Sequence, residues 1–495
     1  MSDADYSGSI ASRPSPVSRS RRRGLRSFRR RLGVTVVILA LICATLVVLD
    51  HLQGPKLQAA QIDTVRAVSQ PNQQLRLFAN ELIAPIRDRQ VTITPATPFV
   101  SRVNAGAISV QFQTRLLSGV RYSVVVRGVT SAYEQQQSTF NYSFTTDAAQ
   151  LFYLDRRDPG AGTGADGEDS IIETGITAAT GTGSADRRVV YSARHIQSFV
   201  RFGNVLAVAL INDDHSSALR LVALSDKAIE NVVLPGKGQL NSLAVSDTGV
   251  LGFVYSSVLP AAGEEQDATS RLDKTLLALN LAGSHQPQPV LGLGNHPFQT
   301  LTWLFIPGGA AAAVLSGDNS LFVANLGSTT PATPLGQFSG LMSAALDGSR
   351  LVVSDPFGPL ALDIATRQTT RLPPNSLRGV TPYGGDVVLV GKNQTRIQEV
   401  VILDSVTGSF TGYVVLNRGL SSKIIYQNAD QLGNIETFRV SPNGQYVAVT
   451  VVPDVAASVS DHYASAPEST SVATMVVEVA TARVVRTVAG FDPNW

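Results

Sequence analysis

Five histidines lie beyond residue 150, and histidine is the side chain most often used for proton transfer and metal binding near neutral pH. They are His195, His215, His285, His296 and His462. No pair shows the His-x-x-x-His or His-Glu-x-x-His spacing that places two metal ligands on one helix face, and the sequence has no Gly-x-Ser-x-Gly nucleophile motif. The linear pattern therefore assigns no catalytic residue, no cofactor-binding residue and no metal ligand, and it favours surface or structural roles for the histidines.

Three acidic or aromatic features remain as candidates for binding. Residues 158–169 combine carboxylates with glycine and could attract Ca²⁺, but they lack the EF-hand order, so a solvated loop is the favoured interpretation. Asp213, Asp214 and His215 offer metal-ligand types without a helical spacing. The aromatic residues Trp303, Phe305 and Trp495 could form a binding face, although aromatic side chains in strands more often belong to a core. None of these features predicts a site on its own.

Composition excludes several classes of protein. Hydrophobic residues make up 44% of the 495 residues and charged residues only 16%, which predicts folded domains rather than a disordered chain. The net charge is +2, yet residues 19–31 alone hold eight arginines and no acid. Because the basic character belongs to this one arm, no nucleic-acid-binding domain is expected. The single cysteine, Cys43, excludes a disulfide framework, and an exported chain of this kind fits a bacterial cell envelope.

An uncharged stretch over residues 32–49 follows the arginines. Eighteen such residues would extend about 27 Å as a helix, close to the ~30 Å hydrocarbon core of a membrane. Arginine clusters stay on the cytoplasmic side. The sequence thus predicts a disordered cytoplasmic tail (1–31), a transmembrane signal anchor (32–49) and a stalk (50–66). This gives a single-pass plasma-membrane protein with its C-terminal domains outside, and the tail would lie near anionic lipid headgroups.

Alternatives for this stretch are a cleaved signal peptide, a lipoprotein and a twin-arginine export signal. Gln58 occupies a position where cleavage requires a small residue. Ile42 precedes Cys43 where lipidation requires a small residue. The pair Arg30-Arg31 is similar to an export signal, but arginine-rich tails produce such pairs by chance. The uncleaved anchor is the favoured interpretation.

Alternating strands follow the predicted stalk. They are expected at residues 91–95, 108–112, 122–126 and 140–144, and turn-forming residues separate them. The order VTITP, LLSGVRYSVVVRGV and FNYSFTT resembles bacterial Ig-like domains of surface-layer and other envelope proteins. That resemblance covers residues 67–147 and implies a β-sandwich used as a spacer or adhesion module.

A repeating unit of short apolar strands and turns fills residues 150–495. Units begin near residues 198, 242, 300, 342, 379 and 436, a spacing typical of four-stranded propeller blades. The stretch from Phe438 to Ala448 resembles blades of TolB-like and related WD-type β-propellers, in which a Ser-Pro-Asn/Asp-Gly turn joins the innermost strand to its neighbour. The fold class predicted for the whole chain is therefore mainly β, with a transmembrane helix, an Ig-like sandwich and a propeller. The blade count is six or seven, because strands at 151–155 and 170–174 could close the ring.

The function expected from these features is binding or scaffolding, with a protein, peptide or glycan recognised by the propeller and no enzymatic activity. One alternative is a propeller hydrolase or lyase acting on envelope polymers, whose acidic or histidine residues would meet at the central channel from separate blades. Another is a structural subunit of a membrane complex. Side chains that converge on the channel mouth with shifted pKa values would favour the enzyme, whereas an apolar rim would favour a binding platform.

Overall fold

The structure is a computed structural model that describes residues 21–51, 54–156 without 105 and 134, 167–176, 187–258, 271–428 without 329, and 432–495 without 464. In helix α1 (Arg21–His51) the described side chains are those of residue 28 and residues 30–45. The first part of the predicted tail, the glycine-rich segment 158–166 and most of the insertion at 260–272 lie outside the described residues.

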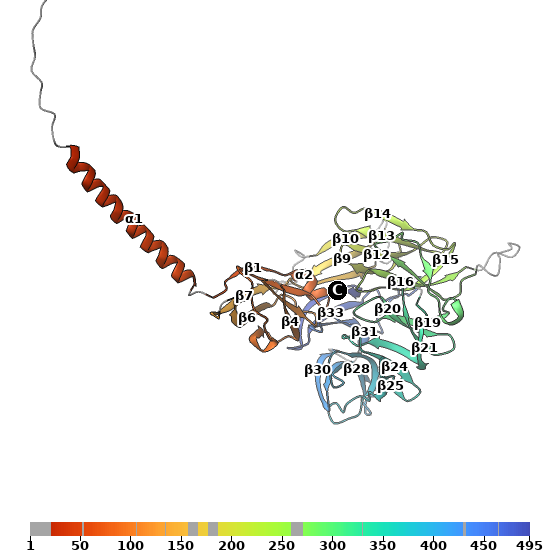
Figure 1. Cartoon of the computed structure of the whole chain (residues 1–495). Helices are drawn as coiled ribbons and strands as arrows, with labels where there is room; N and C mark the ends of the chain where they lie inside the picture. Colours follow the sequence, from red (N-terminus) through yellow and green to blue (C-terminus); the bar gives the residue numbers. More distant parts are fainter. Residues whose placement is uncertain are drawn as a thin grey trace, which may run out of the picture.

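Helix α1 corrects the prediction for the N-terminal region (Figure 1). Residues 21–31, predicted as a disordered tail, form its first turns, so arginines and apolar residues share one helix. Within the described residues, no helix combines the length and apolar character needed to cross a membrane. The predicted transmembrane anchor at 32–49 and the single-pass plasma-membrane location are therefore wrong.

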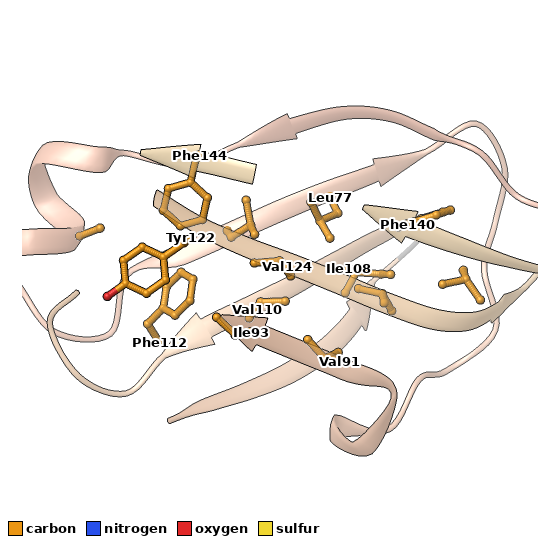
Figure 2. Close-up of a cluster of buried hydrophobic side chains, with 14 of the residues drawn as sticks. Leu77, Val91, Ile93, Ile108, Val110, Phe112, Tyr122, Val124, Phe140 and Phe144 are labelled. Carbon is orange, nitrogen blue, oxygen red and sulfur yellow. The ribbon is translucent and has the colours of Figure 1, made fainter. Parts of the chain in front are cut away.

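Two antiparallel sheets form a β-sandwich after helix α1 (Figure 1). One sheet has the order β1 (Leu57–Gln61), β2 (Gln74–Ala79), β5 (Ala107–Phe112), β4 (Phe99–Asn104), and the other has the order β3 (Val91–Thr94), β6 (Arg121–Thr130), β7 (Gln137–Thr145). Two short helices, α2 (Thr64–Ser69) and η1 (Asp88–Gln90), lie between strands. Alternate residues of β3 and β5 are buried, as their period-two pattern predicts. Figure 2 shows this core, in which Phe112, Tyr122 and Phe144 pack together between the sheets.

Seven four-stranded antiparallel sheets follow in the described part of the chain, and they form a β-propeller. From the innermost strand outward, the blades are: blade 1, β35 (Phe491–Asn494), β8 (Gln150–Asp155), β9 (Asp169–Gly175), β10 (Arg188–Ala193); blade 2, β11 (Ile196–Phe202), β12 (Val205–Ile211), β13 (Ser217–Ala223), β14 (Ile229–Val232); blade 3, β15 (Gly238–Val245), β16 (Val250–Ser257), β17 (Thr275–Asn280), β18 (Gln288–Pro289); blade 4, β19 (Thr300–Phe305), β20 (Ala311–Ser316), β21 (Ser320–Asn325), β22 (Thr333–Gln337); blade 5, β23 (Gly340–Ala344), β24 (Arg350–Asp355), β25 (Gly358–Asp363), β26 (Thr369–Arg371); blade 6, β27 (Tyr383–Leu389), β28 (Arg396–Leu403), β29 (Phe410–Arg418), β30 (Ser421–Gln427); blade 7, β31 (Asn434–Val440), β32 (Tyr446–Val452), β33 (Ala473–Glu478), β34 (Arg483–Ala489). A short helix, η4 (Leu293–Asn295), precedes blade 4.

Blade 1 closes the ring. Its innermost strand, β35, comes from the C-terminal part of the chain and pairs with β8, with Phe491 opposite Leu154. The two strands predicted at 151–155 and 170–174 are β8 and β9 of this blade. The propeller therefore has seven blades, the larger of the two predicted numbers.

Tight turns connect the first and second strands of blades 2 to 7 at one end of the propeller. In blade 7 the predicted Ser-Pro-Asn-Gly turn joins β31 to β32, and Gly444 has a φ of +70° that favours glycine. The Ser441 hydroxyl accepts a hydrogen bond from the backbone N–H of Tyr446 over 2.9 Å and fixes the turn. This end carries the contacts to the sandwich, for example the 2.8 Å ion pair between Arg115 and Asp247, and we call it the sandwich end.

Candidate site at the far end of the propeller

The opposite end of the propeller, here called the far end, is where each innermost strand begins and where second strands connect to third strands. Each innermost strand shows a register shift against its neighbour, for example between Ile196 and Ser198 in blade 2 and between Ile435 and Thr437 in blade 7. A bulge leaves one residue out of the pairing ladder and can re-aim its side chain. Gln197, Asp386 and Glu436 occupy such positions, and the two carboxylates are exposed.

A pocket of about 220 Å³ at the far end brings three of the five histidines together. His195 lies between blades 1 and 2, His215 lies in the turn between β12 and β13, and His462 lies in the long connection between β32 and β33. Asp213 and Tyr463 complete its polar lining. The His195 ring meets the Tyr463 ring edge-on, with centroids 5.7 Å apart.

A network of a buried ion pair and hydrogen bonds lies next to this pocket and includes Tyr463 of its lining. The guanidinium of Arg156 contacts a carboxylate oxygen of Asp461 over 2.9 Å, and their side chains are only 2% and 3% exposed. Arg156 also stacks over the Tyr463 ring at 4.2 Å, and the Tyr463 hydroxyl donates to Asp169. Further hydrogen bonds from Arg156 reach the carbonyl oxygens of Ile196, Gln197 and Ala466. Burial, and next the hydrogen bond to Asp169, raises the pKa of Tyr463, so this phenol stays protonated.

One pair of carboxyl groups lies beside this network, and a second pair lies in blade 6. Burial, and next the neighbouring Glu436, to which it is hydrogen-bonded, together raise the pKa of Glu468 to about 7. Burial also raises the pKa of Glu399 to about 7, with a second contribution from the charge of Asp386. The Glu399 carboxyl packs against Gly385, where a Cβ atom would come within 3.2 Å of it. These glutamates exchange protons near neutral pH, unlike ordinary exposed carboxylates.

Turns between second and third strands add permanent negative charge. In blades 4 and 6 an aspartate accepts hydrogen bonds inside its own turn, Asp318 from Ser316 and Ser320 and Asp404 from the N–H groups of Val406 and Thr407. The Ser316 hydroxyl is the main cause of the lowered pKa of Asp318, and the Val406 N–H is the main cause for Asp404. Because these bonds favour the ionised form, the far end keeps these charges at neutral pH.

Large apolar side chains are exposed at the same end. Phe357 is 86% exposed and Val406 is 92% exposed, both in turns between second and third strands. Tyr383 begins β27 and is 64% exposed. Exposed apolar side chains that gather among charged groups are typical of protein-binding surfaces.

The remaining sequence candidates lie elsewhere or have structural partners. His285 bonds to Glu230 at 2.9 Å and to a backbone carbonyl, so the carbonyl and then Glu230 raise its pKa. Trp303 is buried against Phe305 and Gly252, which places it in the core between blades. His296 directly follows η4 and does not line the histidine pocket.

Asp214, one of the predicted ligand types, is held by Lys237 and Ser216 instead, and the Lys237 hydrogen bond is the main cause of its lowered pKa. Among the described residues, no three histidine, cysteine or carboxylate side chains are grouped so that they could hold a metal ion.

Comparisons with known proteins found remote likenesses among solved structures. No family model matches the chain, and no curated protein matches it. Among solved structures, the β-propeller domain of the Trilobed protease from Pyrococcus furiosus is 10% identical and covers 76% of this chain and 93% of its own, with a TM-score of 0.40. TolB from Acinetobacter baumannii is 13% identical and covers 77% of this chain and 80% of its own, with a TM-score of 0.34. A putative TolB from Agrobacterium tumefaciens is 15% identical over 56% of this chain and 90% of its own, with a TM-score of 0.35.

Proposed function

We propose that the protein is a non-enzymatic binding module whose propeller holds a basic peptide segment of a partner protein at the far end. The observation that carries this proposal is the combination, on one end, of turn aspartates kept ionised by hydrogen bonds within their own turns and of exposed apolar side chains. Permanent negative charge attracts lysine and arginine, and exposed aromatic or aliphatic groups supply the contacts that dominate binding energy.

The lowered pKa values of the turn aspartates favour a role in binding over a role in proton transfer. A general acid or base works best with a pKa near the working pH, and the bonds to Asp318 and Asp404 move their pKa values further from it. A fixed charge serves recognition instead, since it is present whenever the partner arrives. The histidine pocket adds imidazole groups that can donate or accept hydrogen bonds with a peptide backbone.

The proposal is tested with two labelled peptides of equal length, one alternating lysine with leucine and the other glutamate with leucine. Fluorescence anisotropy at low salt should show binding of the lysine peptide only. Replacing Asp318 and Asp404 together by Asn keeps the turn-capping oxygens but removes two charges. We expect the dissociation constant to rise roughly tenfold, because two charges that attract lysine are lost.

A matched control removes two charges at the sandwich end. Asp226 and Asp363 cap turns between third and fourth strands in the same way, by accepting the N–H of Ala228 and of Ala365. Their joint replacement by Asn should leave binding of the lysine peptide unchanged. Equal weakening by both double variants, or binding of the glutamate peptide, would contradict the proposal.

A hydrolase or lyase is a second candidate, favoured by the Glu468–Glu436 pair. Two carboxyl groups that share a hydrogen bond, one with a pKa of about 7, can act as acid and base near neutral pH. Chromogenic glycosides and labelled casein would serve as substrates. Turnover that disappears in Glu468→Gln and persists in Glu478→Gln, a change in an outer part of blade 7, would establish this alternative.

A further inference from the structure

A second cavity, of about 570 Å³, lies where the sandwich meets the propeller, at the end opposite the histidine pocket. We call it the joint cavity. The sandwich side supplies the helix α2 and the connection after β7, and the propeller side supplies the ends of blades 1, 2 and 7. The apolar residues that line it include Val65, Val68, Ala148, Ala149, Tyr446 and Trp495. Its size is within the ~300–1,000 Å³ range of small-molecule sites.

Polar contacts between the two domains hold the walls of the joint cavity in place. The Gln445 side chain accepts a hydrogen bond from the Ser118 N–H over 2.7 Å and donates to the Ser118 carbonyl over 3.2 Å. The Asn443 amide donates to the Leu116 carbonyl over 3.1 Å. These bonds join the backbone of the sandwich to side chains of the turn between β31 and β32. The cavity therefore belongs to one fixed arrangement of the two domains.

One wall of the joint cavity is aromatic and carries a donor. The rings of Tyr446 and Trp495 stack with centroids 6.4 Å apart and planes inclined by 19°. The indole Nε1 of Trp495 is buried and has no hydrogen-bond partner among the described residues. A buried N–H without a partner is unfavourable, and an acceptor on a bound molecule would satisfy it.

The cation of the joint cavity is Arg201. Its Nε donates to the Gly203 carbonyl over 3.0 Å, and its guanidinium lies 4.5 Å from the centre of the Phe152 ring. Within the described residues, no hydrogen bond or ion pair engages its two terminal nitrogens. Burial lowers the pKa of Arg201, although the group remains charged. The carboxylate in the lining, Asp147, already accepts the Thr64 hydroxyl over 2.7 Å.

We infer that the joint cavity binds a small apolar molecule that carries one carboxylate. Both terminal nitrogens of Arg201 can meet the two carboxylate oxygens in parallel, a geometry that guanidinium groups favour. The Trp495 N–H supplies a further donor, and the aromatic wall with the valines of α2 accepts a flat apolar body. This site lies at the other end of the propeller from the proposed peptide surface and does not depend on it.

The probes are 2-naphthoate and its neutral analogue 2-naphthalenemethanol, measured by titration calorimetry with the full chain. Naphthoate should bind more tightly than the alcohol. Arg201→Met should raise the dissociation constant for naphthoate at least tenfold and leave that for the alcohol unchanged. Trp495→Phe keeps a ring but removes the donor, so it should weaken naphthoate binding by a smaller factor.

Two variants of exposed residues test where naphthoate binds without altering a buried core. Val65 is 57% exposed on α2 at the rim of the cavity, and Val233 is 81% exposed away from it. Val65→Glu should weaken naphthoate binding through charge repulsion, and Val233→Glu should not. The inference is overturned if naphthoate and the alcohol bind alike, if Arg201→Met or Val65→Glu binds naphthoate as the wild type does, or if neither probe binds.

Discussion

Replacing Arg156 by Met should lower the free energy of unfolding of the propeller by more than the loss of an exposed ion pair does. Arg156 joins the end of β8 to the long connection between β32 and β33 and to the start of β11, so it links blades 1, 2 and 7 where the ring closes. Methionine keeps an unbranched apolar side chain but removes the charge and every hydrogen bond that the guanidinium makes. Asp461, only 3% exposed, is then left without its cation.

The expected loss is about 3–5 kcal/mol, the cost of removing one partner of a buried ion pair. With an m value of roughly 3 kcal/mol/M, the urea midpoint should fall by about 1–1.7 M. Arg371→Met is the matched control, because Arg371 makes an ion pair of 2.6 Å with Asp355 at the surface, where its side chain is 41% exposed. That variant should shift the urea midpoint far less, because exposed ion pairs contribute little to stability.

Urea unfolding followed by tryptophan fluorescence measures both losses, since Trp495 directly follows the closing strand β35. The double variant Arg156→Met/Asp461→Asn should recover at least about 1 kcal/mol, because it removes the unpaired buried charge and keeps the oxygen that caps the N–H of Tyr463. Equal losses in Arg156→Met and Arg371→Met would refute the claim that this network closes the ring.

Two further predictions concern proton uptake and ring closure. The pKa of Glu399 rises on folding from 4.5 to about 7, so the folded chain binds more protons between these values, and the stability from protonated Glu399 is complete below about pH 4.5 and lost as pH rises through 7. The urea midpoint of the wild type should therefore fall relative to that of Glu399→Gln between pH 5 and 8; a constant difference would exclude this. Gly490→Ala places a Cβ 2.5 Å from the Leu154 carbonyl oxygen, whereas Gly358→Ala, also at positive φ, meets nothing within 4 Å. We expect Gly490→Ala to lose about 2–3 kcal/mol more in urea unfolding, and equal losses would contradict the tight approach of β35 to β8.

Local patterns predicted most of the strands. Five of the six predicted unit starts fall within innermost strands, and the start near 379 lies just before β27, because each of these strands combines an apolar period with a nearby turn. The turns at residues 246–249, 347–349 and 441–444 all join a first strand to a second strand, as expected. Such signals are local, so one sequence is sufficient to read them.

The N-terminal prediction failed for a different reason. The uncharged stretch at 32–49 was interpreted by itself, with the arginines assigned to a separate disordered tail. In the structure the helix begins at Arg21, and charged and apolar residues belong to the same element. Composition alone did not indicate where the helix starts.

The candidate site depended on tertiary structure. His195, His215 and His462 are up to 267 residues apart in the sequence, and only the ring of blades brings them to one pocket. The bulges that release Asp386 and Glu436 from their ladders are register shifts between strands, which a single strand does not encode by itself. The sequence by itself determined a cysteine-poor β protein with propeller-type turns. Ring closure decided which polar groups meet, because it sets the distances between side chains that no linear spacing relates.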